Sequence, residues 1–293
     1  MIEIKNLSKS FDNYQVLKDL NISIEEGRIF GLVGINGAGK STLLRLISGI
    51  YNKDSGSILI DGEEVFENEI VKKKIFFLPD EPFYSSHVTP YNLCDLYQAF
   101  YDFDKEEYIG YLNDYKLPIK KPMSKFSKGM KRQVFISLAL TIKPKYLLLD
   151  EAFDGLDPLA RLKFKKAILK LVEKNKTTVI ISSHSLRELE DISDCYGLLD
   201  KGMITSTGNI DNRIESYHKY QMAFEKEIKE EDFEIAFIKY EQIGRIVKVV
   251  VKEELNEFSE LVKKYNPLII DEISIDFEDL FILEVENRGY LND

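Results

Sequence analysis

Residues 34–42 read Gly-Ile-Asn-Gly-Ala-Gly-Lys-Ser-Thr and meet the pattern G-x-x-x-x-G-K-[S/T] of a phosphate-binding loop. The glycines Gly34, Gly37 and Gly39 allow the backbone to turn, so that successive N–H groups point at one anion. Lys40 supplies a charge to the outer phosphates, and the Ser41 hydroxyl is a ligand for Mg2+. The sequence therefore predicts a site for a nucleoside triphosphate and Mg2+.

The segments on either side of this loop fit the motif. Residues 28–33 form a short apolar run suited to a buried strand, and residues 41–48 carry the apolar spacing of a helix that stops at Gly49. A strand, a glycine-rich loop and a helix are the order that the motif requires. Kinases, small GTPases, helicases and transport ATPases all contain such a loop, so the other segments must decide between them.

Two acids end an apolar run at residues 146–151. Asp150 is placed to hold Mg2+, and Glu151 is placed to polarise a water, since in-line attack on a phosphate needs a metal and a base. The alternative is an ordinary buried strand with solvated acids at its end.

A strand at residues 177–182 precedes His184, and the pattern Ser185-x-x-Glu188 predicts a capping box that opens the next helix. His184 then lies at the carboxyl end of a strand, beside the expected phosphates. A lone histidine is more often a structural residue, and that alternative stays open.

Two further helix starts carry candidate site residues. Ser127 begins a helix that runs to about Thr141, and the free N–H groups behind such a cap can bind an anion. Asp157 stands at an N-cap with Pro158 at the first helical position. Both residues can also be caps and nothing more.

In this order, the segments resemble the ATP-binding cassette of ABC transporters over about residues 1–212. Residues 34–42 resemble the Walker A motif, which adds Asn36, Ala38 and Thr42 to the expected ATP contacts. Residues 126–130 resemble the family signature, with Ser127 and Gly129 as further nucleotide contacts. Residues 147–151 are similar to Walker B with its catalytic glutamate, residues 155–157 to the D-loop with Asp157, and His184 to the switch histidine.

Phe11 stands where the family keeps an aromatic ring that stacks on adenine, although it also fits the core of an amphipathic strand. Asp80 replaces the usual Q-loop glutamine. Its carboxylate attracts a metal and repels a phosphate, and we predict that attraction to the metal outweighs repulsion from the phosphate. Lys128 and Met130 depart from the signature Ser-Gly-Gly-Gln, and Lys128 can compensate charge. Ala152 replaces a proline without removing a chemical group.

The resemblance implies an α/β fold with a P-loop NTPase (RecA-like) core, an antiparallel β subdomain and a helical subdomain at about residues 82–141. The implied function is ATP hydrolysis by an exporter subunit that drives integral-membrane permease subunits. ATP-dependent dimerisation would be head to tail, as a homodimer or as a heterodimer with a related cassette. Lys40 would bind phosphates, Glu151 would activate water, and His184 would steady the γ-phosphate.

The main alternative is a soluble ABC ATPase that acts on ribosomes or DNA. Such proteins usually show two cassettes in one chain, basic linkers or a long coiled-coil insertion, and this sequence has none of them. The net charge of −10 also argues against a nucleic-acid partner. A hydrolysis-dead regulator is disfavoured, because Glu151 and His184 are both retained.

The rest of the chain bears on location and domain organisation. Cys94 and Cys195 are far apart, and there is neither an apolar run of 18 residues nor a secretion signal. We therefore expect a cytoplasmic protein, peripheral on the inner face of the cell membrane. The length predicts one large or two unequal domains, with an ABC domain at 1–212 and an accessory α+β domain at 213–293.

Residues 209–213 are a polar junction before the accessory domain, and the charge run at 225–232 is most simply a solvated turn. The predicted elements of the accessory domain are strands at 233–238, 245–251 and 267–270, and helices at 253–264 and 276–286. In the helical subdomain, Thr89 and Pro90 predict a helix start, and the aromatic residues that follow fit either the core or an exposed interface.

Overall fold

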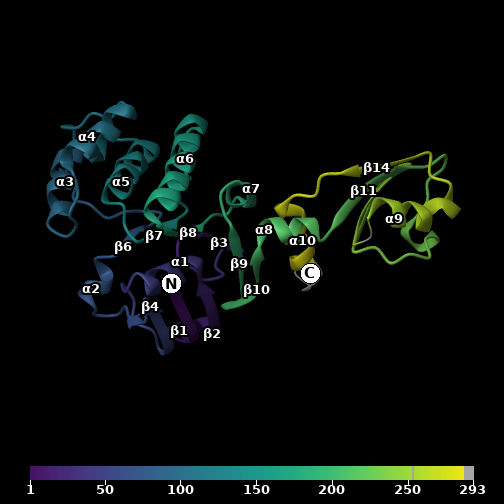
Figure 1. The fold of residues 1–293 in the computed structure, drawn as a ribbon, viewed down its shortest axis with the longest axis horizontal. Helices are drawn as coiled ribbons and strands as arrows, with labels where there is room; N and C mark the ends of the chain where they lie inside the picture. The colour runs from purple at the N-terminus through teal and green to yellow at the C-terminus, as the bar shows by residue number, and fades with distance from the viewer. Residues whose placement is uncertain (253, 287–293) are drawn as a thin grey trace. The chain divides into compact units, whose positions relative to one another are not determined.

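The computed structural model of the chain describes residues 1–252 and 254–286. The chain divides into two compact units, Met1–Thr207 and Gly208–Asp293 (Figure 1). No helix among the described residues combines the length and the apolar character needed to cross a bilayer. The functional division at residue 212, with an accessory role for 213–293, stays a prediction.

The central sheet of the first unit has six strands in the order β10-β9-β3-β8-β7-β6. The strands are β3 (Ile29–Val33), β6 (Ile75–Leu78), β7 (Tyr146–Asp150), β8 (Thr178–Ser182), β9 (Cys195–Asp200) and β10 (Met203–Asn209). Strands β3, β7 and β8 are buried at every residue, as expected for parallel strands that are covered on both faces. From β9 to β6 the neighbours pair in parallel, so the loops after β3, β6, β7 and β8 meet at one edge.

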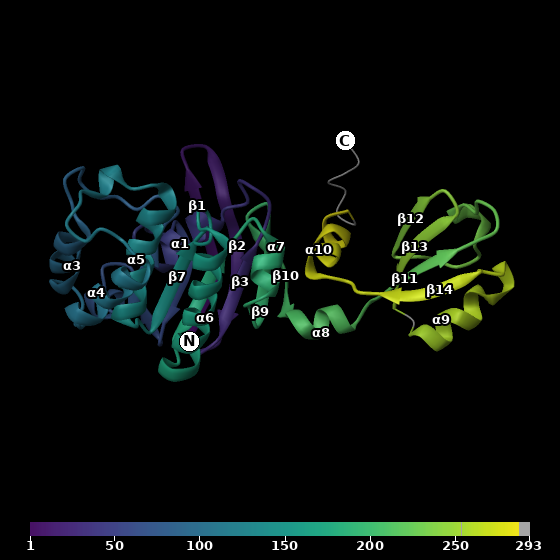
Figure 2. The same cartoon turned by 90° about the horizontal axis from the view of Figure 1, so that it is seen from above.

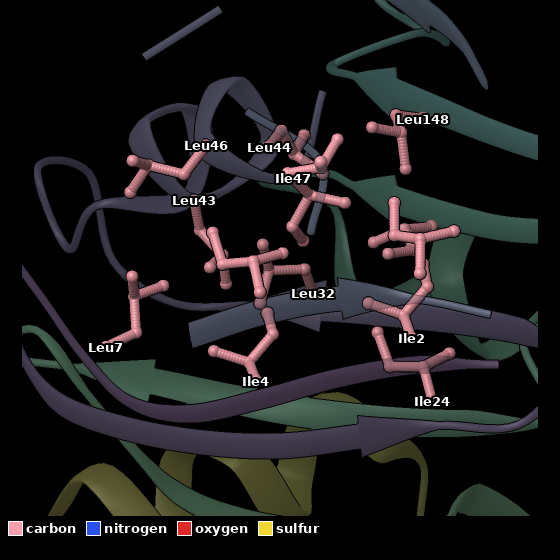
Figure 3. Close-up of a cluster of buried hydrophobic side chains, with 14 of the residues drawn as sticks. Ile2, Ile4, Leu7, Ile24, Leu32, Leu43, Leu44, Leu46, Ile47 and Leu148 are labelled. Carbon is pink, nitrogen blue, oxygen red and sulfur yellow. The ribbon is translucent and has the colours of Figure 1, made fainter. Parts of the chain in front are cut away.

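A second, antiparallel sheet pairs strands in the order β2-β1-β4-β5. Its strands are β1 (Ile2–Phe11), β2 (Tyr14–Ile24), β4 (Ser55–Ile60) and β5 (Glu63–Glu64). The predicted turn between β4 and β5 is present, because Asp61 and Gly62 both have positive φ, at 56° and 84°. Figure 3 shows apolar side chains of this sheet facing those of helix α1 (Lys40–Ile47), including Ile4 and Leu43. This core fixes the helix that follows the phosphate-binding loop.

Helices α3 (Pro90–Gln98), α4 (Lys105–Asp114) and α5 (Lys128–Ile142) form the helical region, with α6 (Pro158–Asn175) nearby (Figure 1). The short helices α2 (Glu69–Lys72) and α7 (Leu186–Glu190) complete the first unit. The predicted helix start is confirmed, since the Thr89 hydroxyl accepts a hydrogen bond from the Asn92 N–H at 3.2 Å. Leu93 is buried, but Leu96 and Phe100 are 54% and 62% exposed. The apolar and aromatic residues after Pro90 therefore contribute both to the core and to the exposed surface.

The second unit is an α+β arrangement built on a four-stranded antiparallel sheet, β12-β13-β11-β14 (Figure 2). The strands are β11 (His218–Ala223), β12 (Lys239–Ile243), β13 (Ile246–Val251) and β14 (Ile269–Ile273). Helices α8 (Ile210–Glu215), α9 (Leu255–Val262) and α10 (Phe277–Glu286) accompany them. One face of the sheet packs an aromatic core around Tyr220, Phe233 and Phe258.

One sequence expectation for this unit is wrong, and three of its elements, β11, β12 and α8, were not predicted. Residues 233–238 are not a strand: their alternate apolar side chains Phe233, Ile235 and Phe237 enter the core without ladder pairing. The strand in this part of the chain begins later, as β12 at Lys239. The junction at 209–213 begins helix α8, because the Asn209 side chain accepts a hydrogen bond from the Asn212 N–H at 3.0 Å. Glu253, the expected start of a helix, lies outside the described residues, as do residues 287–293.

Candidate nucleotide-binding site

The phosphate-binding loop joins β3 to α1 at the edge of the central sheet where the carboxyl ends of the strands meet. Gly39 has φ of 106°, a conformation that side chains other than glycine rarely adopt, and an added Cβ would lie 2.9 Å from Leu17. A Cβ at Gly34 would lie 2.4 Å from the Leu199 carbonyl oxygen. Both positions therefore require glycine.

Lys40 lies inside this loop and is only 7% exposed. Its Nζ donates to the Gly34 carbonyl oxygen at 2.6 Å. Burial lowers the pKa of Lys40, and the negative charges of Glu151 and Asp150 oppose that shift. The predicted Walker A lysine and the two predicted Walker B acids are thus neighbours in space, although more than a hundred residues separate them in the sequence.

Asp150 is 1% exposed at the end of β7. Its Oδ1 accepts a hydrogen bond from the Ser182 hydroxyl at 2.7 Å, whereas its Oδ2 is buried without a hydrogen-bond partner. An unsatisfied buried carboxylate oxygen is costly, and a divalent cation would satisfy it. No group of three or more His, Cys, Asp or Glu side chains within the described residues could hold a metal. The unpartnered Asp150 Oδ2 fits Mg2+, which keeps water and phosphate ligands and needs few protein groups.

Glu151 and His184 are in direct contact, as expected for residues that follow adjacent strands. Glu151 has φ of 49°, the left-handed region, and its N–H donates to the Ser182 carbonyl oxygen at 3.1 Å. Its Oε2 accepts from the His184 backbone N–H at 3.1 Å and lies 2.8 Å from the imidazole Nδ1. The His184 side chain is 63% exposed and that of Glu151 is 19% exposed. Glu151 is therefore held at a fixed place while His184 remains accessible.

The predicted capping box at Ser185 is not formed. The Ser185 side chain makes no cap hydrogen bond, although Ser185 is the N-cap residue of α7. The Ser183 hydroxyl instead bonds both residues of the predicted box. It donates to the Glu188 carboxylate at 2.9 Å and accepts a hydrogen bond from the Ser185 N–H at 3.0 Å. Glu188 is buried and is also paired with Arg161 of α6 at 2.6 Å. The prediction was therefore wrong: the Glu188 carboxylate pairs with Ser183 and Arg161 instead of the Ser185 N–H.

Both predicted caps are present at the two helix starts. Ser127 caps α5 by accepting a hydrogen bond from the Met130 N–H at 3.2 Å, and Asp157 caps α6 by accepting from the Ala160 N–H at 2.9 Å. A Cβ at Gly129 would lie 2.3 Å from the Gly155 carbonyl oxygen, so the two backbones touch. Nucleotide contacts of Ser127, Gly129 and Asp157 stay predictions.

Asp80 follows β6 and lies against two cations. Its Oδ1 accepts a hydrogen bond from Arg132 at 2.8 Å and is 3.3 Å from the Lys128 Nζ. The Arg132 side chain is 1% exposed and also donates to the Pro79 carbonyl oxygen at 2.8 Å. Sequence reasoning did not identify Arg132; the available signal was its place one helical turn after Lys128. The metal contact predicted for Asp80 is untested.

Phe11 does not belong to the core, which was the alternative to stacking on adenine. Its ring is 40% exposed, meets Tyr51 edge-on at 5.3 Å between centroids, and has the Lys9 ammonium 5.3 Å away. An exposed ring of this kind suits the stacking role, which stays a prediction.

Comparison with known proteins agrees with this geometry. The family model described as ABC transporter matches residues 17–154. The ABC transporter ATP-binding protein YtrB of Bacillus subtilis is 34% identical over 284 residues, covering 96% of this chain and 97% of YtrB. The lantibiotic transport ATP-binding protein SrtF of Streptococcus pyogenes is 32% identical over 230 residues, covering 77% of this chain and 99% of SrtF.

A solved structure of the ATP binding subunit of an ABC transporter superposes with a TM-score of 0.67 at 28% identity, covering 73% of this chain and 91% of that one. The predicted fold class is confirmed by this likeness.

Proposed function

This chain belongs to the ABC transporter family, and we propose that, as an ATP-hydrolysing subunit of such a transporter, it drives the integral-membrane permease subunits of an exporter. The observation that carries the assignment of the site is one set of contacts: Lys40 is held in the loop by the Gly34 carbonyl oxygen, Asp150 has a buried oxygen without a partner, and Glu151 contacts His184. Similarity to SrtF, whose name states lantibiotic transport, supports a transport function, and export is the direction that we propose. We place the chain in the cytoplasm, peripheral on the inner face of the cell membrane.

The proposed roles follow from the contacts around the phosphate-binding loop. Lys40 and the loop N–H groups would bind the phosphates of ATP, with Asn36, Gly37, Ala38 and Thr42 as further contacts. Ser41 and Asp150 would hold Mg2+, which supplies positive charge at the β- and γ-phosphates. Glu151 would accept a proton from the attacking water, and His184 would contact the γ-phosphate. The Glu151–His184 contact supports these two roles, since it brings a general base and a hydrogen-bonding imidazole together at one place.

We further propose a head-to-tail dimer, either of this chain or with a related cassette, in which Ser127 and Gly129 face the partner's nucleotide. The exposed position of Ser127 at the start of α5 supports this arrangement. No described feature favours the alternative of an ATPase that acts on ribosomes or DNA, and the net charge of −10 opposes it.

A surface on the helical region fits a permease segment. Phe83 is 98% exposed and Phe100 is 62% exposed. A groove of about 650 Å³ beside α3 is lined by apolar and aromatic side chains, among them Leu96, Tyr97 and Phe100, and by the charged residues Glu69, Lys72 and Lys73 of the α2 segment. Exposed apolar surface that is rimmed by charge marks a protein interface.

Replacing Phe100 by serine is expected to weaken binding of the chain to its permease at least tenfold. The reason is that burial of a phenyl ring contributes about 1.5 to 3 kcal/mol. The measurement is co-purification of the tagged chain with permease subunits in detergent. Leu169→Ser is the matched control, since Leu169 is 47% exposed on α6, away from this groove. Equal retention of the permease by both variants would exclude the groove as the docking surface.

Asp80→Asn tests whether this carboxylate lies near the metal. If it does, loss of its charge should raise the Mg2+ concentration for half-maximal ATPase activity about two- to tenfold, and Asp80→Gln should keep or raise the activity. The measurement is a Mg2+ titration at saturating ATP. An unchanged midpoint with a lower plateau would assign Asp80 to its pairs with Arg132 and Lys128 alone.

A further inference from the structure

Lys128 is the first residue of α5 and lies between two acidic loops. Its Nζ is 2.5 Å from an Asp154 oxygen and 3.3 Å from an Asp80 oxygen. Asp80 follows β6, and Asp154 lies in the turn between β7 and α6. One ammonium group thus connects three segments that come from distant parts of the sequence.

The Lys128 side chain is closely packed against the backbone around this bridge. A Cβ at Gly155 would lie 3.2 Å from the Lys128 Cγ, and a Cβ at Gly129 would lie 2.3 Å from the Gly155 carbonyl oxygen. The Lys128 stem therefore packs on the turn that its charged end binds. The hydrogen bond to Lys128 is the main cause that lowers the pKa of Asp154, and the same bond raises the pKa of Lys128.

Asp154 is tied directly to the residue proposed as the general base. Its backbone N–H donates to the Glu151 carbonyl oxygen at 3.1 Å. Glu151 itself holds a left-handed φ of 49°, which costs about 1 to 2 kcal/mol and persists only where the surroundings impose it. A contact that fixes the 151–154 turn therefore helps to hold Glu151 in place.

We propose that Lys128 is a positioning residue for ATP hydrolysis, which fixes the Glu151–Asp154 turn against the Asp80 loop through its two ion pairs. This proposal rests on the role given to Glu151 above. Lys128 acts through Asp154, so its loss should lower kcat and leave KM for ATP nearly unchanged. Because the three side chains are 42 to 51% exposed, the bridge should also weaken with salt.

The test is steady-state ATPase kinetics of the full-length chain. Lys128→Met keeps the stem and removes the charge, and it should lower kcat about 2- to 10-fold, the range expected for two half-exposed ion pairs. Lys128→Arg, which keeps the positive charge, should retain most of the wild-type kcat. Raising KCl from low to high concentration should lower kcat of the wild type more than that of Lys128→Met. Lys131→Met is the control, because Lys131 lies over the Tyr84 ring and makes no ion pair within the described residues.

A double-mutant cycle with Asp154→Asn decides whether the pair itself matters. The effects of Lys128→Met and Asp154→Asn on kcat should be clearly less than multiplicative when combined. Multiplicative effects, or a wild-type kcat in Lys128→Met, would overturn the proposal. If Lys128→Met fails to fold, Asp154→Asn carries the test through its salt dependence. Normal ATP hydrolysis by the Glu151→Gln variant would instead refute the role of Glu151 as general base, on which this proposal rests.

Discussion

Replacement of Glu151 by glutamine is expected to lower ATP turnover by a factor of about 10² to 10⁴, the usual contribution of a positioned general base. Glutamine keeps the size of the side chain and an oxygen that can accept from the His184 N–H, so the turn should survive. ATP binding should survive as well, because Lys40 and the loop N–H groups are untouched. With ATP bound and hydrolysis blocked, the variant should elute as a dimer in size-exclusion chromatography.

Glu173→Gln is the matched control for this experiment, since Glu173 is exposed near the carboxyl end of α6. It should keep wild-type turnover and wild-type elution. Normal turnover by Glu151→Gln would remove Glu151 from the mechanism. The Glu151–His184 contact would then be structural, as the alternative for a lone histidine supposes.

Mixing two inactive variants should restore activity if the site is shared between chains. Lys40→Ala removes the phosphate-binding lysine, and Ser127→Arg blocks the amino end of α5 and its cap. A heterodimer of the two keeps one site in which both residues are intact. Random association at an equal ratio should then return about a quarter of the wild-type activity, from a level near zero.

The control mixture combines Lys40→Ala with Glu151→Gln. Both residues act on the nucleotide of their own chain, so every site in the heterodimer carries one defect and no activity should return. ATPase activity across a series of mixing ratios provides the measurement. Absence of recovery at every ratio of Lys40→Ala to Ser127→Arg would indicate a monomeric ATPase, in which Ser127 only caps α5.

Local sequence patterns were sufficient wherever one short segment decides its own structure. The phosphate-binding loop needs its glycines for backbone geometry, and the caps Ser127, Asp157 and Thr89 act within three residues. Apolar runs that are buried on both faces predicted strands β3, β7 and β8 of the central sheet at the correct places. In the second unit the same patterns failed at 233–238, because alternating apolar residues can enter a core without pairing as a strand.

What the sequence by itself determined is the order of motifs, and with it the parallel sheet whose loops converge on Lys40, Asp150, Glu151 and His184. Only the tertiary structure decided which charges meet: Asp80 with the buried Arg132, Lys128 with Asp154, and Glu188 with Arg161. The physical reason is the separation along the sequence over which each interaction acts. Backbone preference and apolar periodicity act over a few neighbouring residues, whereas these ion pairs join residues of helices and loops that come together only when distant parts of the chain pack.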